Sequence, residues 1–461
     1  MKKEGREGPK SPVPSPRGRK GEALPKGRAE MPRSTARGRL KCALRALGRS
    51  AFLLAGIGGL LTLGGCWDKV ELEDIVFASA IGLDRAEQPG RLDVTFELMN
   101  TKKASIPISQ TAQKEPNVTY VTVRDTTPIW ARDIANSVVT RRINISHVQT
   151  IVIGEELVRQ EDLFVTLAAA LRDPEMRRAT PIIVTHERAE DFLRENRPRF
   201  ETLPYIFYRF KLNRWKDTGT VPISTLNEFL RAYSIRAGYL VTYATARREE
   251  GSEGRDDRAF PGELRIEGGD PVEMIGSAAL ARGKMVGALT GYETRFALLL
   301  GNQLHVATYL IGFRDPVDPT YYVSTRIQNW EGPRIRIDVS REIPRIVVDV
   351  PFRVEVLSVP SRVDYVNDAE KRKLLHESIR KELESAFRRV VHRAQKEFET
   401  DIFGWSRFAL RLFPTWEDYR RYDFPGKFPR AEVEVHVDVK IINFGKTVTT
   451  QEESPEPKMR W

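Results

Sequence analysis

A short apolar segment that ends at a cysteine divides the chain. Residues 51–63 are almost wholly apolar, and Gly64, Gly65 and Cys66 follow them. An aliphatic Leu63 and two small residues before a cysteine form a lipobox, at which a peptidase can reach the backbone and the thiol can take a diacylglyceryl group. The run has signal-peptide length and is too short to span a bilayer well. A buried core cysteine is the alternative, but the basic flank favours cleavage and lipid attachment at Cys66.

The basic excess of the chain lies in the same leader. The whole sequence has a formal net charge of +11, and residues 1–65 hold fifteen Lys and Arg against four Glu. Residues 66–461 are therefore neutral, with 59 basic and 59 acidic residues. The predicted lipoprotein signal peptide covers residues 1–65, and a start at Met31 would give it a more usual length. The global charge thus describes the leader and indicates no nucleic-acid partner for the body.

Composition and motifs argue against several classes of enzyme. Two cysteines and six histidines are too few for a disulfide scaffold or a cysteine- or histidine-rich metal site. The sequence has no phosphate-binding loop and no G-x-S-x-G nucleophile elbow. His186 and Glu187 begin like a zinc-protease helix but lack the second histidine, and Ser146 and His147 are neighbours that point to opposite faces of a strand. We therefore predict no catalytic residue, no metal ligand and no cofactor.

Strand and helix patterns alternate through the body. In its first part we predict strands at 74–84, 91–99, 118–123, 147–153 and 181–185, and helices at 128–139, 162–171 and 188–194. The pattern predicts an α+β protein of three mixed α/β domains, each a sheet flanked by helices. We place these domains at residues 66–195, 196–300 and 301–446, and a polar tail at 447–461.

The first of these helices has a clear start signal. Thr127 would cap it and Pro128 would occupy its first turn, where a missing N–H costs nothing. Apolar residues then recur at helical spacing. We expect them to form the face that packs on the core: Ile129, Trp130, Ile134 and Val138.

Two segments of the middle part leave their role open. Residues 200–215 alternate aromatic with basic side chains, which fits core packing of an amphipathic helix, and also fits contact with a partner or a membrane. Nucleic-acid stacking is disfavoured by the neutral body. Residues 248–271 are charged and rich in glycine, so they predict a long surface loop. A hairpin at 274–289 and a helix at 293–300 follow.

The C-terminal part contains the clearest element. Apolar residues recur every three or four positions through 367–400, which predicts a helix of about 50 Å with one apolar stripe. Asn367 or Asp368 could cap this helix. We expect it to lie on a sheet built from strands within 321–358 and an edge strand at 432–442, although a coiled-coil partner is the alternative.

Several motifs occur in the order found in one known family. Cys66-Trp67-Asp68-Lys69-Val70-Glu71-Leu72, followed by Ile81-Gly82-Leu83-Asp84, resembles the start of the Ger(x)C spore germination lipoproteins. Further stretches are similar to that family's later motifs: Ser146-His147 with 151–157, Lys284 to Leu289, Asp401-Ile402-Phe403-Gly404 with Pro414 and Trp416, and Ile442-Asn443-Phe444-Gly445. Trp405-Ser406 departs from a common Phe-Gly, and the 248–271 loop is enlarged. The resemblance covers about residues 66–446.

The resemblance to this family implies a function, which the composition of the chain does not. It implies a non-enzymatic subunit of a nutrient germinant receptor, anchored by lipid on Cys66 to the outer face of the spore inner membrane. Its partners would be the A-type and B-type membrane subunits. Trp67 and Asp68 would be docking or structural residues near the anchor. Two alternatives remain: a solute-binding lipoprotein of a transporter, which would need two similar lobes, and a lipid-anchored hydrolase.

Overall fold

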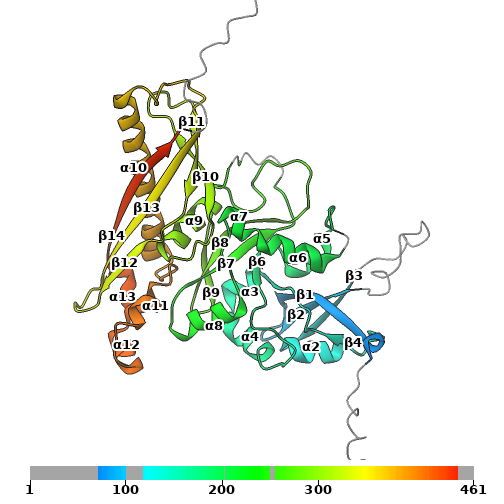
Figure 1. Cartoon of the computed structure of the whole chain (residues 1–461). Coiled ribbons are helices and arrows are strands. Elements are labelled where there is room, and N and C mark those ends of the chain that lie inside the picture. The colour runs from blue at the N-terminus through cyan, green and yellow to red at the C-terminus, as the bar shows by residue number, and fades with distance from the viewer. Residues whose placement is uncertain (1–70, 100–117, 202, 250–253, 255, 445–461) are drawn as a thin grey trace, which may run out of the picture. The chain divides into compact units, whose positions relative to one another are not determined.

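Two β-sheets organise the part of the chain that the structure describes. The computed structural model describes residues 71–99, 118–201, 203–249, 254 and 256–444. Figure 1 shows the two sheets and the helices that cover them. A sheet flanked by helices occurs twice, which confirms the predicted α+β class.

Nine strands form the first sheet within the described residues, in the order β3-β2-β1-β5-β6-β7-β8-β9, with β4 beside the start of β1. β1, β5, β6 and β7 are parallel neighbours, and the remaining long strands are antiparallel. Strand β5 (Thr150–Gly154) is buried along its whole length, as expected for a parallel strand with both faces covered. The other strands are β1 (Ile75–Arg85), β2 (Leu92–Met99), β3 (Val118–Asp125), β4 (Arg142–Asn144), β6 (Ile182–Thr185), β7 (Tyr239–Thr245), β8 (Glu273–Ala281) and β9 (Lys284–Leu289).

Helices cover both faces of this sheet. Because side chains alternate along a strand, β5 sends Ile151 and Ile153 to one core and Val152 to the other. The first core holds α2 (Pro128–Ala135), α3 (Glu155–Gln160), α4 (Leu163–Ala170) and α8 (Leu226–Ser234), and the second holds α5 (Ala189–Glu195) and α6 (Pro204–Asn213). A short η1 (Leu72–Asp74) precedes β1, and α7 (Trp215–Thr218) follows α6.

The second sheet has five described strands. β10 (Thr308–Arg314), β11 (Tyr322–Gln328), β12 (Arg334–Asp338) and β13 (Arg345–Ser358) are antiparallel, and β14 (Glu432–Asn443) lies parallel to β13. Every second residue of β13 is buried from Ile346 to Val356. This alternation indicates a sheet with one face on the core.

A long helix covers that face. Asp368 caps α10 (Ala369–His392) with its carboxylate, and the helix continues as a π-turn, η3 (Arg393–Glu397). Leu375, Ile379 and Leu383 are buried against the sheet. The predicted amphipathic helix on the C-terminal sheet is therefore confirmed, and no coiled-coil partner is needed to cover its stripe. Small helices α11 (Trp405–Leu410), α12 (Trp416–Tyr422), α13 (Phe424–Lys427) and η4 (Phe428–Arg430) lead to β14.

Helix α9 (Gly291–Leu300) connects the two sheets and is buried at every residue except Glu293, which is half-buried. Thr290 and Glu293 form a reciprocal capping box at its start. Phe296 stacks edge-on against Phe387 of α10 at 4.9 Å between ring centres. One hydrophobic core thus extends from Leu240 and Leu289 of the first sheet to β13 of the second.

Three details differ from the sequence predictions. Strands β7–β9, expected in a middle domain, continue the first sheet, with β7 hydrogen-bonded to β6. The domain boundary expected at residue 195 therefore falls within the stretch of sequence that forms this sheet. Strand β5 begins at Thr150, because residues 145–148 form a turn. The apolar face expected for α2 is wrong: Pro128, Ala131 and Ala135 are buried, whereas Trp130, Ile134 and Val138 are exposed.

The two middle segments whose role the sequence left open, 200–215 and 248–271, are partly buried and partly exposed in their described residues. In α6, Phe207 and Tyr208 are buried while Phe210 is exposed, so core packing accounts for only part of the aromatic set. The described part of the 248–271 loop folds back on the body, where Asp257 pairs with the guanidinium of Arg295 at 2.5 Å.

Candidate functional site

Polar side chains collect where the four parallel strands of the first sheet end. In open α/β sheets this edge is where ligands commonly bind. It holds, at the ends of β1, β5 and β6, the residues Asp84, Glu155, His186, Glu187 and Arg188. We call this group the carboxyl edge.

Asp84 caps helix α5 from a distant strand. Its carboxylate accepts hydrogen bonds from the backbone N–H groups of Ala189 at 2.7 Å and Glu190 at 3.0 Å. Gly154 leaves room for this carboxylate, since a Cβ at that position would collide with it. Burial raises the pKa of Asp84 to about 6, despite those hydrogen bonds. The carboxylate therefore satisfies the unpaired donors of the helix start.

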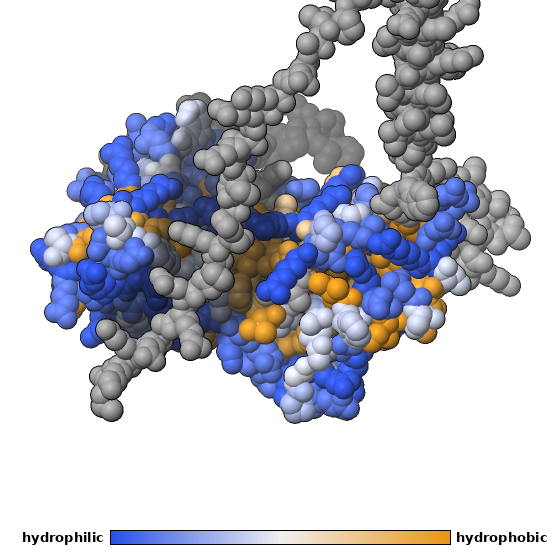
Figure 2. All heavy atoms as spheres, turned by 90° about the horizontal axis from the view of Figure 1, so that it is seen from below, coloured by the Kyte–Doolittle hydropathy of each residue, from blue (hydrophilic) through white to orange (hydrophobic). Residues whose placement is uncertain are grey.

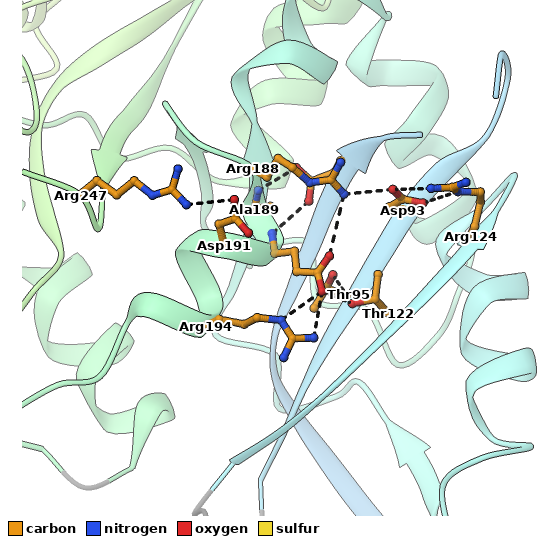
Figure 3. Close-up of polar contacts among 11 residues, drawn as sticks. Asp93, Thr95, Thr122, Arg124, Arg188, Ala189, Asp191, Arg194 and Arg247 are labelled. Atoms are coloured by element: carbon orange, nitrogen blue, oxygen red, sulfur yellow. Dashed lines mark hydrogen bonds and ion pairs between the residues drawn. The ribbon is translucent and has the colours of Figure 1, made fainter. Parts of the chain in front are cut away.

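A network of ion pairs lies beside α5. Figure 3 shows Arg124 and Arg188 reaching Asp93 from two sides, at 2.7 and 3.0 Å. Burial alone would raise the pKa of Asp93, but these two guanidinium groups hold it below its usual value. Glu190 accepts from Thr122 at 3.0 Å and from Arg194 at 2.9 Å. The network joins strands β2 and β3 to α5.

The remaining acids of the edge also have partners within the chain. The hydroxyl of Tyr243 donates to Glu155, and the His186 ring lies 3.2 Å from the same carboxylate. Glu187 accepts from the Thr245 hydroxyl at 2.8 Å and from the backbone of residue 246 at 2.6 Å. Burial raises the pKa of Glu155, but hydrogen bonds from Tyr243 and a neighbouring arginine bring it below the usual value. The edge therefore stabilises the fold with its carboxylates.

One buried carboxyl group stands apart from this edge. Glu97 on β2 is fully buried, and the Ser79 hydroxyl donates to it at 2.5 Å. Its second oxygen has no hydrogen-bond partner among the described residues. Burial raises the pKa of Glu97 to about 7, which the Ser79 hydrogen bond only partly offsets. The group can change its charge near neutral pH.

A pocket of about 190 Å³ lies between α8, β7, α11 and the loop that precedes α11. Asp401 shapes that loop, because its carboxylate accepts from the backbone of Phe403 at 3.1 Å and Ser406 at 2.5 Å. Gly404 has a φ of 76°, which a side chain would disfavour. Trp405 is buried and donates to the carbonyl of Leu300 at 2.9 Å. The core therefore accommodates the tryptophan at the position where the sequence departs from the family's common phenylalanine.

The sequence-predicted site residues lie outside the described residues: Leu63, Gly64, Gly65, Cys66, Trp67 and Asp68. Ser146 and His147 do not form a nucleophile–base pair, since Ser146 bonds Asn144 and the His147 ring packs edge-on against Phe77. Among the described residues no cluster of three or more metal-ligating side chains occurs. Sequence reasoning missed the roles of Asp84 and Asp401, although both stand inside quoted family motifs.

Comparison with known proteins identifies the class as spore germination proteins. A model of the spore germination protein N-terminal domain matches residues 68–246, and a model of the spore germination B3/GerAC-like C-terminal domain matches residues 275–445. Together they cover most of the chain. The chain belongs to the Ger(x)C family.

Individual relatives agree with this assignment. Spore germination protein KC of Bacillus subtilis (strain 168) is 29% identical over 137 residues, which are 29% of this chain and 33% of that protein. Spore germination protein B3 of the same organism is 21% identical over 84% of this chain and 96% of its own length. A crystal structure of the GerBC protein aligns with a TM-score of 0.48 and 16% identity, over 82% of this chain and 100% of that one.

Proposed function

We propose that this protein is a lipid-anchored, non-enzymatic subunit of a nutrient germinant receptor. It assembles with A-type and B-type membrane subunits on the outer face of the spore inner membrane and is needed for nutrient-triggered germination. The observation that carries the proposal is the order of the motifs: a lipobox ending at Cys66 directly precedes the family match that begins at residue 68.

Anchoring through lipid is supported by the sequence at the start of the body. The leader combines a basic flank, a short apolar run and small residues before Cys66. Within the described residues no helix has both the length and the apolar character to cross a membrane. One acyl chain holds a protein only weakly, so firm attachment takes two or three chains or a second contact.

The non-enzymatic role is supported by the use of the carboxyl edge. Asp84, Glu155 and Glu187 all accept hydrogen bonds from their own chain, and these bonds join β1 to α5, β7 to α3, and β7 to the turn before α5. Such groups hold the body rigid for assembly. A solute-binding protein is less well supported, because the two described sheets differ in strand order and do not form two similar lobes.

The test compares the two cysteines of the precursor. Cys66→Ala should move the protein from the membrane fraction to the soluble fraction and slow nutrient-triggered germination by about tenfold or more, because the lipid is lost. Cys42→Ala is the matched control, since that cysteine would be removed with the leader. Fractionation by immunoblot and loss of spore refractility after nutrient addition give the two readouts. Full germination with a soluble Cys66→Ala protein would contradict the proposal.

Assembly with the A-type and B-type subunits is tested by affinity purification. Affinity purification of the wild-type chain from spore membranes in mild detergent should recover the A-type and B-type subunits. Recovery of importer permease components in their place would support the solute-binding alternative.

A further inference from the structure

Helix α2 turns its most apolar side chains away from the core. The exposed fractions are 60% for Trp130, 40% for Ile134 and 73% for Val138. Trp130 and Ile134 are four positions apart and share one side of the helix, and Val138 lies in the turn after it. Helix α4 packs beside α2 and exposes Val165. We call these four residues the α2 patch. Figure 2 shows hydrophobic residues gathered over this part of the molecule, to the right in that view.

Such a patch needs an explanation. Single exposed apolar residues are normal on a soluble protein, but several together on one face mark an interaction surface. Helix α2 already has a buried face, which consists of Pro128, Ala131 and Ala135. The exposed apolar residues are therefore additional to the face that packs on the core. The outward stripe is therefore available for a contact outside the described residues.

A basic hollow adjoins the patch. It has a volume of about 740 Å³ and lies between α2 and β4. Trp130 lines it together with Arg132, Arg141 and Arg142, and Asp133 is its acidic member. Arg132 is held by Asp173 at 2.8 Å, while Arg142 is well exposed and lies 3.5 Å from Glu175. Arginines beside an exposed tryptophan suit a surface of phosphate groups over hydrocarbon.

The anchor brings this region to the membrane. Ile75, the first residue of β1, is only nine positions after Cys66, so even a fully extended chain spans at most about 30 Å. Ile75 pairs with Arg142 in the register of β1 and β4. Residue 143 in turn donates its N–H to Asn136, in the turn after α2. Strand β1, the first strand after the proposed lipid attachment point, therefore begins beside the hollow.

We propose that the α2 patch and the arginines beside it lie on an anionic bilayer, with Trp130 and Val138 in the interfacial layer and Arg141 and Arg142 at the lipid phosphates. This inference rests on the proposed lipid attachment at Cys66. Tryptophan is favoured at the interface, and arginine stems reach past apolar surface to the headgroups. The contact supplies the second attachment that a weakly held acyl anchor requires, and it sets which end of the body faces the membrane.

The experiment places one fluorescent label on the mature chain. Val138→Cys is purified from membranes, labelled with a nitrobenzoxadiazole dye and reconstituted into vesicles of equal parts phosphatidylglycerol and phosphatidylcholine. Leu310→Cys is the matched control, because it is 62% exposed on the second sheet. Spin-labelled lipids should quench the dye at 138 about threefold or more above the dye at 310, since an interfacial side chain lies within reach of the acyl chains.

Paired substitutions separate the apolar from the basic contribution. Trp130→Ala should lower the quenching at 138, whereas Trp330→Ala, which removes a tryptophan that is 72% exposed elsewhere, should leave it unchanged. Arg141→Glu with Arg142→Glu, or vesicles of phosphatidylcholine alone, should bring the quenching toward the value at 310. Unchanged quenching after both the charge reversal and Trp130→Ala would overturn the inference.

The number of labels per chain tests the anchor separately. If Cys66 carries lipid and Cys42 leaves with the leader, the introduced cysteine is the one thiol that reacts. One label with equal quenching at 138 and 310 rejects the patch and leaves the anchor standing. An additional label on Cys66 rejects the anchor, and quenching after addition of vesicles then still decides the patch. Shielding of residue 138 in spore membranes but not in lipid vesicles would assign the patch to a partner protein and overturn the bilayer contact.

Discussion

Glu97 holds a carboxyl group inside the first sheet, where burial separates it from water. A charged carboxylate in such a place is costly, so the group keeps its proton to a higher pH than an exposed glutamate does. Ser79 supplies its hydrogen bond, and Tyr208 lies near enough for the charge of Glu97 to raise that phenol's pKa too. The pKa of about 7 makes the free energy of unfolding depend on pH near neutrality.

Glu97→Gln should remove much of this dependence. The folded pKa of about 7 lies above the ordinary 4.5, so the stabilisation is full below pH 4.5 and is lost as the pH rises through 7. From pH 5 to pH 8 the wild type should lose up to about 3 kcal/mol through this group, and the variant should not. Urea unfolding at both pH values measures it, with exposed Glu87→Gln as control. An equal loss in Glu97→Gln would refute this explanation.

Helix α5 depends on a cap that comes from another element. Arg188 precedes it and makes no side-chain capping bond, so Asp84 of β1 takes the two leading N–H groups. Helix α10, in contrast, carries its own cap in Asp368. Helix α5 is therefore held to the first sheet by the cap at its start, and helix α10 is held to the second sheet by its apolar stripe.

Asp84→Ala should loosen α5. The backbone N–H groups of Ala189, which is buried, and of Glu190, which is partly buried, lose their acceptor, which costs about 2 kcal/mol. Amide hydrogen exchange of residues 189–192 should become faster than in the wild type, while the exposed Asp438→Ala control should not change it. Unaltered exchange in α5 would show that another group can replace the cap.

The stripe of α10 offers a paired test of burial. Leu375 is fully buried, whereas its neighbour Leu374 is half exposed on the same helix. Leu375→Ala should lower the free energy of unfolding by about 2–5 kcal/mol, because it leaves a cavity under the sheet. Leu374→Ala has the same change of helix propensity and should cost well under half as much. Denaturant unfolding of both variants measures the difference, and equal losses would contradict the observed face.

The two sheets share one core through α9. Phe296 and Leu300 are buried in the same cluster as residues of β8, β13 and α10. Loss of packing at this junction should therefore reach both sheets, unlike loss of packing on an outer helix.

Phe296→Ala tests this coupling. It should destabilise the protein by about 3–5 kcal/mol and speed hydrogen exchange in both β5 and β13, since the two sheets open together. Leu375→Ala is the comparison, because Leu375 lies on α10, which covers the second sheet, and its cavity should affect mainly that sheet. Faster exchange confined to β13 in the Phe296→Ala protein would show that the sheets unfold independently.

Much of the local structure was predictable because it depends on near neighbours. The caps at Thr127 and Asp368, the hairpin of β8 and β9, and the α10 stripe all follow from residue types at fixed spacings. The arrangement of the carboxyl edge could not be predicted in this way. Asp84 and Ala189 are 105 positions apart in sequence, so no spacing rule links the carboxylate to the helix that it caps.

The residue pattern determined most of the strands and helices and which family the body resembles, because periodicity, caps and short motifs act over a few residues. Tertiary structure alone decided that β7–β9 extend the first sheet and that α2 packs through its alanines rather than through Trp130. Strand pairing and the choice of a buried face depend on which distant surfaces are already occupied. Helix α2 carries two faces that could be buried, and only the packed sheet selects between them.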